Sequence, residues 1–409
     1  MNVGFYYHVE AEFDRAGGAR VPALIGLFVN ELARRAGRVT FYTHGQARAG
    51  IEDFPLSEPL VRCIDLGPRP RFPEAMFLPS RSLRAFRPQA DGVDALFIRG
   101  PTPLLPHLVK AVGDMPVVLH IVANYTIEDR DQRTRSEPRW RDEVLRHLFR
   151  LYARRQRRVS RGTRVLVNSP HLADLFDRTD VGIVMDSTLT ADSVASDPRS
   201  SDPEAGRGRP ARLLLTGRLI PEKGLWEAAD ALRLLSERGY DTLLDIVGWQ
   251  VPTDPVFKAF WAHVEGLGVT DRVRFVGYVP AGRELAEVYR SADIFLLPTS
   301  SRAEGFPRSI LEAMGAGVPV VTTPVCGIPH WIQDGREALF VEPRSAAGVA
   351  DAVEALLSSP RLYDSTARAG WEFAQNHTIE KCCKTLARHI VDWASGPAKR
   401  AVSREGLTT

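Results

Sequence analysis

Two glutamates, Glu304 and Glu312, lie on either side of the start of a short predicted helix. The continuous apolar run at residues 294–297 precedes them and is typical of a buried parallel strand. The free N–H groups of the helix's first turn point to the end of that strand, where open α/β sheets bind ligands and where phosphate is favoured. Carboxylates facing a phosphate would repel it, so we expect both glutamates to face hydroxyl groups. A phosphate between two polyols describes a nucleotide sugar.

Two cations, Arg218 and Lys223, follow an earlier predicted strand, within the segment 217–224. This segment is not a P-loop, because Glu222 and Gly224 stand where that motif needs glycine and serine or threonine. Cations at the carboxyl edge of a parallel sheet, beside a helix N-terminus, neutralise the charge that grows on a diphosphate as its sugar leaves. Fixed cations would then replace a divalent metal, and we expect neither a metal nor another cofactor.

Both segments resemble motifs of family 4 glycosyltransferases. Glu304-Gly305-Phe306-Pro307 with Leu311-Glu312-Ala313-Met314 and Gly317-Val318-Pro319-Val320-Val321 is similar to that family's Glu-x7-Glu signature, and 217–224 to its Gly-Arg-x4-Lys-Gly segment. The resemblance implies an α/β chain with the GT-B fold, two Rossmann-like doubly wound domains facing a central cleft, and retaining, metal-independent sugar transfer. It implies that Glu304 contacts the donor sugar, that Glu312 binds the ribose, and that Arg218 and Lys223 hold the diphosphate.

The remaining donor-binding residues that we predict lie around the helix start and near the nucleobase. They are Gly305, Phe306, Pro307, Arg308 and Ser309, together with Tyr278. Trp249 stands near a position where relatives often carry a second glycine, and it would narrow the donor pocket.

The N-terminal half offers weaker signals. Gly17 and Gly18 follow a predicted strand at 2–7 and precede an amphipathic helix, so we interpret them as a βα turn that a phosphate or acceptor can approach. Their spacing lacks the Gly-x-Gly-x-x-Gly fingerprint of a nicotinamide or flavin enzyme. His120 lies near the end of a predicted strand at 117–122, and the resemblance implies a place beside the scissile sugar bond. A hydrogen-bonded core histidine is the alternative.

Alternating strands and helices predict two parallel sheets. We expect residues 1–190 to form an acceptor-binding domain and residues 211–377 the donor domain. Residues 191–210 contain no aromatic residue and predict a flexible linker. The resemblance implies that a helix at 378–395 crosses back to the N-terminal domain, and residues 396–409 are expected to form a flexible tail.

Composition narrows the class of protein. The 409 residues carry a formal net charge of +3, too small to indicate nucleic-acid binding. The four cysteines show neither metal spacing nor a disulfide framework, and a cytoplasmic location fits them. We expect no signal peptide and no membrane-spanning helix, because the required apolar runs are missing. The Arg-rich helix predicted at 137–160 is either a surface helix or a weak contact with an anionic membrane. Asp129-Arg130-Asp131 matches a short metal motif, which we discount.

These features predict a retaining hexosyltransferase that moves a hexose-like sugar from a nucleotide diphosphate sugar to an acceptor hydroxyl. The expected catalytic residues are His120, Arg218, Lys223 and Glu304. The acceptor is a small molecule, a lipid-linked molecule or a glycan, bound by loops such as 8–18, 44–58 and 67–88. Two alternatives stay open: a nucleotide-sugar epimerase of GT-B-like fold, whose product would form without an acceptor, and a non-catalytic nucleotide-sugar-binding protein.

Overall fold

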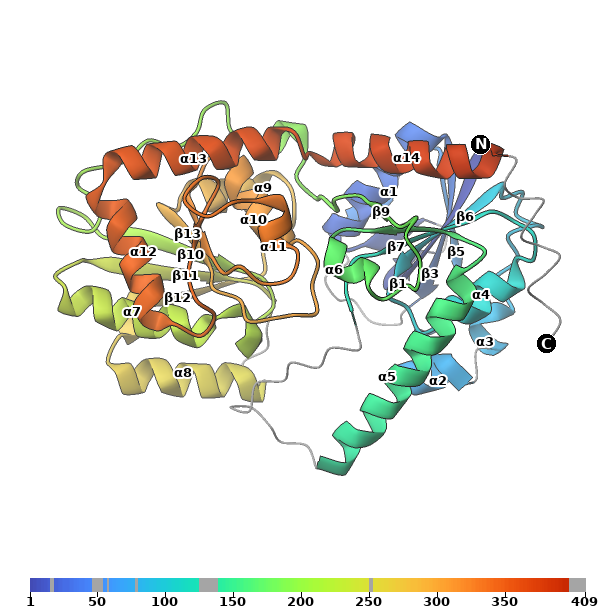
Figure 1. Cartoon of the computed structure of the whole chain (residues 1–409), viewed down its shortest axis with the longest axis horizontal. Helices are drawn as coiled ribbons and strands as arrows, with labels where there is room; N and C mark the ends of the chain where they lie inside the picture. Colours follow the sequence, from blue (N-terminus) through green and yellow to red (C-terminus); the bar gives the residue numbers. More distant parts are fainter. Residues whose placement is uncertain are drawn as a thin grey trace. The chain divides into compact units, whose positions relative to one another are not determined.

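The computed structural model describes residues 1–14, 18–45, 54–56, 59–77, 80–124, 139–249 and 253–396. The chain divides into two compact units. Unit 1 comprises Met1–Ile127, Glu137–Asp186 and Ile379–Thr409, and unit 2 comprises Glu128–Ser136 and Ser187–Thr378. Both are parallel α/β folds, drawn in Figure 1. The Asp129-Arg130-Asp131 motif lies outside the described residues.

Unit 1 is built on a parallel sheet with the strand order β5-β3-β1-β6-β7-β8-β9. The strands are β1 (Asn2–Phe13), β3 (Arg38–Gly45), β5 (Val61–Asp65), β6 (Ala95–Gly100), β7 (Val117–Ile121), β8 (Arg164–Val167) and β9 (Gly182–Ile183). The helices are α1 (Ala23–Ala36), α2 (Phe72–Phe77), α3 (Ser80–Leu83), α4 (Leu105–Ala111), α5 (Arg139–Ser160), α6 (Pro170–Ala173) and α14 (Ile379–Ser395).

Alternating side chains of this sheet bury both of its faces. Phe5 and Phe97 pack on one face against residues of α1 and α14, while Tyr6 and Ile98 pack on the other against a cluster that includes Leu105 of α4. Successive residues of a strand point to opposite faces, so one strand supplies both cores. Figure 1 shows α14, the last helix of the chain, lying alongside α1.

The connection after β1 differs from the predicted βα turn. β1 continues to Phe13 and forms a hairpin with β2 (Ala19–Val21), which pairs in turn with β4 (Phe54–Leu56), both pairings being antiparallel. Gly18 therefore lies in a hairpin turn, where its N–H donates to Asp14 Oδ1 at 2.8 Å. Gly17 lies outside the described residues. The short alternation of Ala19, Arg20 and Val21 was too brief to predict a strand, and α1 begins only after Pro22.

Unit 2 is a second parallel sheet, in the order β12-β11-β10-β13-β14-β15. The strands are β10 (Ala211–Thr216), β11 (Thr242–Val247), β12 (Val273–Gly277), β13 (Ile294–Leu297), β14 (Val320–Thr322) and β15 (Leu339–Phe340). The helices are α7 (Leu225–Glu237), α8 (Pro255–Leu267), α9 (Arg283–Arg290), α10 (Arg308–Gly315), α11 (Ile328–Trp331), α12 (Ala346–Ser358) and α13 (Pro360–Gln375), with 3-10 turns η2 (Ala191–Ser193), η3 (Pro221–Lys223) and η4 (Thr270–Arg272). The strand order reverses between β10 and β13, and ligands bind doubly wound sheets at such a point.

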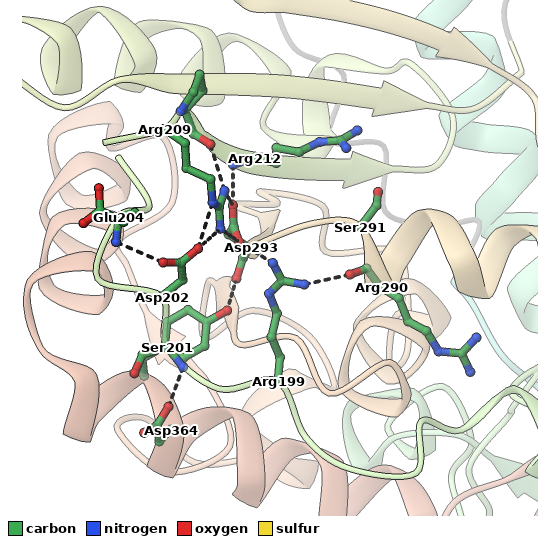
Figure 2. A network of polar contacts seen from close by, with 12 residues as sticks. Arg199, Ser201, Asp202, Glu204, Arg209, Arg212, Arg290, Ser291, Asp293 and Asp364 are labelled. Atoms are coloured by element: carbon green, nitrogen blue, oxygen red, sulfur yellow. Dashed lines mark hydrogen bonds and ion pairs between the residues drawn. The ribbon is translucent and has the colours of Figure 1, made fainter. Parts of the chain in front are cut away.

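Residues 191–210, predicted as a flexible linker, pack within unit 2 instead. Figure 2 shows the reason: Arg199 and Arg209 both reach the buried carboxylate of Asp293, at 2.5 Å and 2.8 Å. The N–H of Arg199 also donates to the carbonyl of Gly317 at 2.9 Å. Low apolar content indicated a linker, but here ion pairs replace apolar contacts. The boundary between the units falls at Asp186/Ser187 rather than at residue 190.

The C-terminal helix α14 belongs to unit 1, although it follows unit 2 in the sequence. Ile379, Cys383, Leu386 and Ile390 are buried among residues of α1 and the sheet. Residues 397–409, most of the predicted tail, lie outside the described residues. No helix in the described ranges is both long and apolar enough to cross a membrane.

Candidate functional site

The candidate site of unit 2 is formed by the loops that leave β10 and β13. The two loops are joined, because Ser300 N–H and Thr299 Oγ1 both donate to the carbonyl of Glu222 at 2.8 Å. Gly224 permits this approach: a Cβ there would lie 2.4 Å from the carbonyl oxygen of Pro298, and its φ is 81°. The predicted diphosphate segment and the loop carrying Glu304 therefore meet at the carboxyl edge of the sheet.

Lys223 and Glu304 form an ion pair at this edge. Lys223 Nζ lies 2.6 Å from Glu304 Oε2, with 9% of the lysine side chain and 28% of the glutamate side chain exposed. Burial acts to raise the pKa of Glu304, but the charge and hydrogen bond of Lys223 and the charges of Arg218 and Arg308 hold it below its usual value. Glu304 thus remains ionised among three cations, and the local charge suits an anionic ligand.

Glu312 is held by two hydroxyl groups. Its Oε1 accepts from Thr188 Oγ1 at 2.6 Å, and its Oε2 accepts from Tyr289 OH at 2.8 Å. The Tyr289 hydroxyl also lies 2.6 Å from Thr216 Oγ1, at the end of β10. Burial and the Glu312 carboxylate raise the pKa of Tyr289, so the phenol stays protonated and donates a hydrogen bond to Glu312. A carboxylate oxygen has two lone pairs, so each Glu312 oxygen can accept a further hydroxyl.

The helix start between the two glutamates is the start of α10. Pro307 occupies the N-cap position of α10, and Arg308 and Ser309 form its first turn and are partly exposed. Gly305 and Phe306 are buried behind them. The first-turn N–H groups of α10 therefore lie near the end of β13, a position that favours an anion.

Tyr278 and Arg218 lie on neighbouring segments of the same edge. Tyr278 directly follows β12 and is half-buried, and Gly277 before it has a φ of 90°. Arg218 follows β10 and is exposed, while Trp249 follows β11 with 54% of its surface exposed. The loops after β10, β11 and β12 thus place these three side chains at the carboxyl edge of the unit 2 sheet.

Sequence reasoning missed two side chains that hold Glu312 and a third that binds the loop before Glu304. Thr188 and Tyr289 carry no motif, and Thr188 lies 124 residues from Glu312 in the sequence. Cys326, after β14, donates from Sγ to the carbonyl of Ser301 at 2.8 Å and has a φ of 54°, which is rare outside glycine. Burial and the charge of Glu304 raise the pKa of Cys326 to about 12, so it is a thiol. For Cys326 the sequence offered one signal, its position directly before Gly327, the glycine that precedes α11.

His120 lies inside unit 1. It is 1% exposed, its Nε2 lies 3.2 Å from the carbonyl of Val184, and its ring stacks on Phe97. Burial lowers the pKa of His120 to about 4, with the nearby Asp186 and Arg99 acting in opposite directions. Among the described residues its Nδ1 has no hydrogen-bond partner. This is the environment of a neutral core histidine, the alternative that the sequence left open.

No group of three or more His, Cys, Asp or Glu side chains in the described part of the chain is arranged to hold a metal ion. The polar side chains at the unit 2 edge are instead cations, carboxylates and hydroxyls that form ion pairs and hydrogen bonds with one another. The arrangement offers positive charge for a phosphate beside carboxylates for hydroxyl groups.

Residues 198–372 match the sequence profile of a family described as "Glycosyl transferases group 1". This segment is a group 1 glycosyltransferase domain. It contains Arg218, Lys223, Glu304 and Glu312. The chain is 34% identical over 162 residues to mannosylfructose-phosphate synthase of Agrobacterium fabrum, covering 39% of this chain and 35% of that protein. It is 32% identical over 254 residues to D-inositol 3-phosphate glycosyltransferase of an Arthrobacter species, covering 57% of this chain and 58% of that protein.

The chain thus spans between about a third and about three fifths of the length of these curated relatives. Solved structures cover more of it. Sucrose-phosphate synthase from Thermosynechococcus elongatus superposes with a TM-score of 0.71 at 16% identity, over 95% of this chain and 98% of that one. HepE of Anabaena in complex with UDP-glucose has a TM-score of 0.70 at 14% identity, over 96% and 99%. These likenesses show the GT-B fold, and the predicted pair of doubly wound α/β domains is confirmed.

Proposed function

We propose that this protein transfers a hexose-like sugar from a nucleotide diphosphate sugar to an acceptor hydroxyl, with retention of the anomeric configuration and without a metal, as a member of glycosyltransferase family 4. The observation that carries this proposal is the pairing of Lys223 with Glu304 at the reversal point of the unit 2 sheet. The group 1 domain supports a nucleotide-sugar donor, and HepE, of the same fold, has been solved with UDP-glucose.

The roles follow from charge and reach. The donor's diphosphate takes Lys223 Nζ from Glu304, and Arg218 and the first turn of α10 add further positive potential. Glu304, released from Lys223, accepts hydroxyls of the sugar, and Glu312 accepts the ribose hydroxyls. Phe306 and Pro307 shape the loop, and Tyr278 lies on the base side.

The reaction then breaks the bond between the anomeric carbon and the phosphate oxygen, and the electron pair goes to the diphosphate. The acceptor oxygen bonds to the anomeric carbon on the same face, and its proton passes to an oxygen of the leaving diphosphate. Lys223 and Arg218 stabilise the charge that develops on that group. In this scheme His120 stays a neutral residue of the unit 1 core, and no step depends on it.

The test is donor consumption by the purified chain. UDP-glucose, GDP-mannose and ADP-glucose are incubated with the protein, with and without EDTA, and nucleoside diphosphate release and the anomeric configuration of any product are followed by NMR. We expect one donor to be consumed, EDTA to have no effect, and Lys223→Met to abolish release. An epimerised nucleotide sugar formed without an acceptor would support the epimerase. A folded protein that binds donors but never consumes them would support the non-catalytic alternative.

The surface of α5 adds a weaker proposal, a peripheral contact with an anionic membrane that fits the expected cytoplasmic location. Arg150, Arg154, Arg157 and Arg158 are exposed and recur on one side of the helix. Clustered arginines attract anionic lipids. Vesicles containing phosphatidylserine should therefore sediment the wild type but not a variant with these arginines replaced by glutamine, and neutral vesicles should sediment neither.

A further inference from the structure

Two large apolar side chains are exposed among the described residues of unit 2, Trp249 at 54% and Val276 at 41%. They lie at the carboxyl ends of neighbouring strands, because Trp249 follows β11 and Val276 is the last residue but one of β12. The register of these strands shifts by one residue here, so that Val276 is an extra residue of β12. Bulges are common beside functional sites, and apolar side chains that are exposed together often mark a ligand-binding groove.

The ends of β10, β11 and β12 meet in three glycines. Gly217 follows β10, Gly248 follows β11, and Gly277 is the last residue of β12. Gly217 N–H donates to the carbonyl of Val247 and Gly248 N–H to that of Gly277, both at 2.9 Å. A Cβ on Gly248 would lie 1.8 Å from the carbonyl oxygen of Gly217, whereas a Cβ on Gly217 or Gly277 would meet no described atom within 4 Å. The three glycines therefore form one stretch of partly exposed backbone, the glycine surface, which a flat ligand can approach closely.

Each glycine of this surface is followed directly by a side chain of the candidate site. These side chains are Arg218 after β10, Trp249 after β11 and Tyr278 after β12. One of them is a cation and two are aromatic. The charge therefore lies on the β10 side, where the diphosphate is proposed to bind, and the aromatic rings lie on the β11 and β12 side. An uncharged planar group suits that second side better than a phosphate does, because it can stack on an aromatic ring.

The proposed ribose site leads to the same surface. The Tyr289 hydroxyl joins Glu312 Oε2 to Thr216 Oγ1, at 2.8 Å and 2.6 Å. Thr216 is the last residue of β10 and directly precedes Gly217. A ribose bound at Glu312 therefore lies near the β10 end of the glycine surface. Because the base of a nucleotide is attached directly to its ribose, the base then extends over the glycines toward β11 and β12.

We infer that the indole of Trp249 stacks on the nucleobase of the donor, beside the glycine surface. Stacking on an aromatic side chain strengthens the binding of any base, because every base has a π-face. The contact also removes from water an indole that is more than half exposed in the free protein. The inference rests on the proposed function and deepens it, because it assigns a side chain to the base of the donor.

The first experiment compares an aromatic with an aliphatic replacement of Trp249. UDP, GDP and ADP are titrated by calorimetry into the full chain and into Trp249→Phe and Trp249→Leu. For the nucleotide that binds the wild type most tightly, Trp249→Leu should raise the Kd at least about fivefold, and Trp249→Phe should raise it by no more than about twofold. Leucine keeps apolar bulk, so the difference between the two variants reports the ring. Both variants should melt close to the wild type, because the side chain is exposed.

Tryptophan fluorescence provides the second readout. An indole that stacks on a base loses emission, so the saturating nucleotide should quench part of the wild-type emission. Trp249→Phe should bind without this quench. Trp261→Phe is the matched control and should keep the quench, because Trp261 lies on α8 and stacks on Phe257 at 5.9 Å.

Either of two results overturns the inference: an equal Kd for the wild type and Trp249→Leu, or a quench that survives in Trp249→Phe. If Trp249→Leu fails to fold, the emission of the wild type and of Trp249→Phe decides. Failure of the proposed function looks different, because then no nucleoside diphosphate binds the wild type, and both proposals fall together.

Discussion

Tyr289→Phe distinguishes two roles of Tyr289: orienting the Glu312 carboxylate and stabilising the fold of unit 2. The ring of Tyr289 is 1% exposed, so phenylalanine keeps the packing and removes only the hydroxyl. That hydroxyl joins Glu312 Oε2 at 2.8 Å to Thr216 Oγ1 at 2.6 Å. Without it, Thr188 is the one hydrogen-bond partner left to the Glu312 carboxylate among the described residues.

The magnitude follows from these contacts. A hydrogen bond to a charged group contributes roughly 1.5–3 kcal/mol, and a buried group left without its partner costs roughly 1–3 kcal/mol. We expect a loss of stability near 2 kcal/mol, which for a domain of this size lowers Tm by about 4–8 °C. Because Thr188 still restrains the carboxylate, about 1 kcal/mol of ribose binding should be lost, or about fivefold in Kd.

The assay compares a ribonucleoside diphosphate with its 2′,3′-dideoxy analogue by calorimetry. Tyr289→Phe should weaken the first about fivefold and leave the second unchanged, because the analogue has no hydroxyls for Glu312. Tyr363→Phe is the matched control: its hydroxyl donates to the carbonyl of Asp293 at 2.7 Å, at the opposite edge of the sheet. It should lower Tm similarly and affect neither ligand. Equal weakening of both ligands by Tyr289→Phe would refute a role in orienting Glu312.

Three further predictions test the remaining contacts, one of them with a matched control substitution. Gly224→Ala should lower Tm and weaken nucleotide binding, because its Cβ would press on Pro298; Gly239→Ala, with a similar φ of 79° but open space, should only lower Tm. Asp293→Asn should cost about 3 kcal/mol in thermal denaturation, because it removes the charge that Arg199 and Arg209 share. The difference should shrink as the pH falls below about 4, where the unfolded chain takes up the proton first, and should vanish once the folded carboxylate, whose pKa is lowered, is protonated too. The pKa of His120 is about 4 in the folded protein against 6.5 in the unfolded chain, so the free energy of unfolding should fall by up to about 3 kcal/mol as the pH drops from 6.5 to 4. His120→Leu should flatten this dependence of stability on pH. An unchanged dependence would contradict the burial of His120 as a neutral base.

The fold could be predicted because its signals are local. Continuous apolar runs such as 294–297 indicate strands buried on both faces. In unit 2, every strand except β15 coincides with a predicted strand, and each of these has a helical pattern before or after it. The strands that escaped prediction, β2, β4 and β15, are three or two residues long and carry too few side chains to show a period. Their pairing depends on neighbours that only the folded sheet supplies.

The candidate site could be predicted only in part, for the same reason. Lys223 and Glu304 sit in segments whose glycines and prolines already mark the turns at strand ends, so their meeting follows from the sheet. Thr188 acts through a contact across a long stretch of sequence, because it lies 124 residues from its partner. The linker prediction at 191–210 was wrong because composition reports apolar content, while Arg199 and Arg209 are fixed by charge.

The place of α14 in unit 1 has a consequence for how the chain is made. Residues 379–395 complete the apolar face on which α1 also packs, so that face can close only after the ribosome has made unit 2 and α14. At about 5–20 residues per second, synthesis of residues 187–378 alone takes about 10–40 s. During that interval unit 2 leaves the ribosome as one uninterrupted stretch. The N-terminal part of unit 1 meanwhile exposes the apolar surface that α14 will cover, and a chaperone can bind that surface. Synthesis of α14 is then the event that lets unit 1 finish folding.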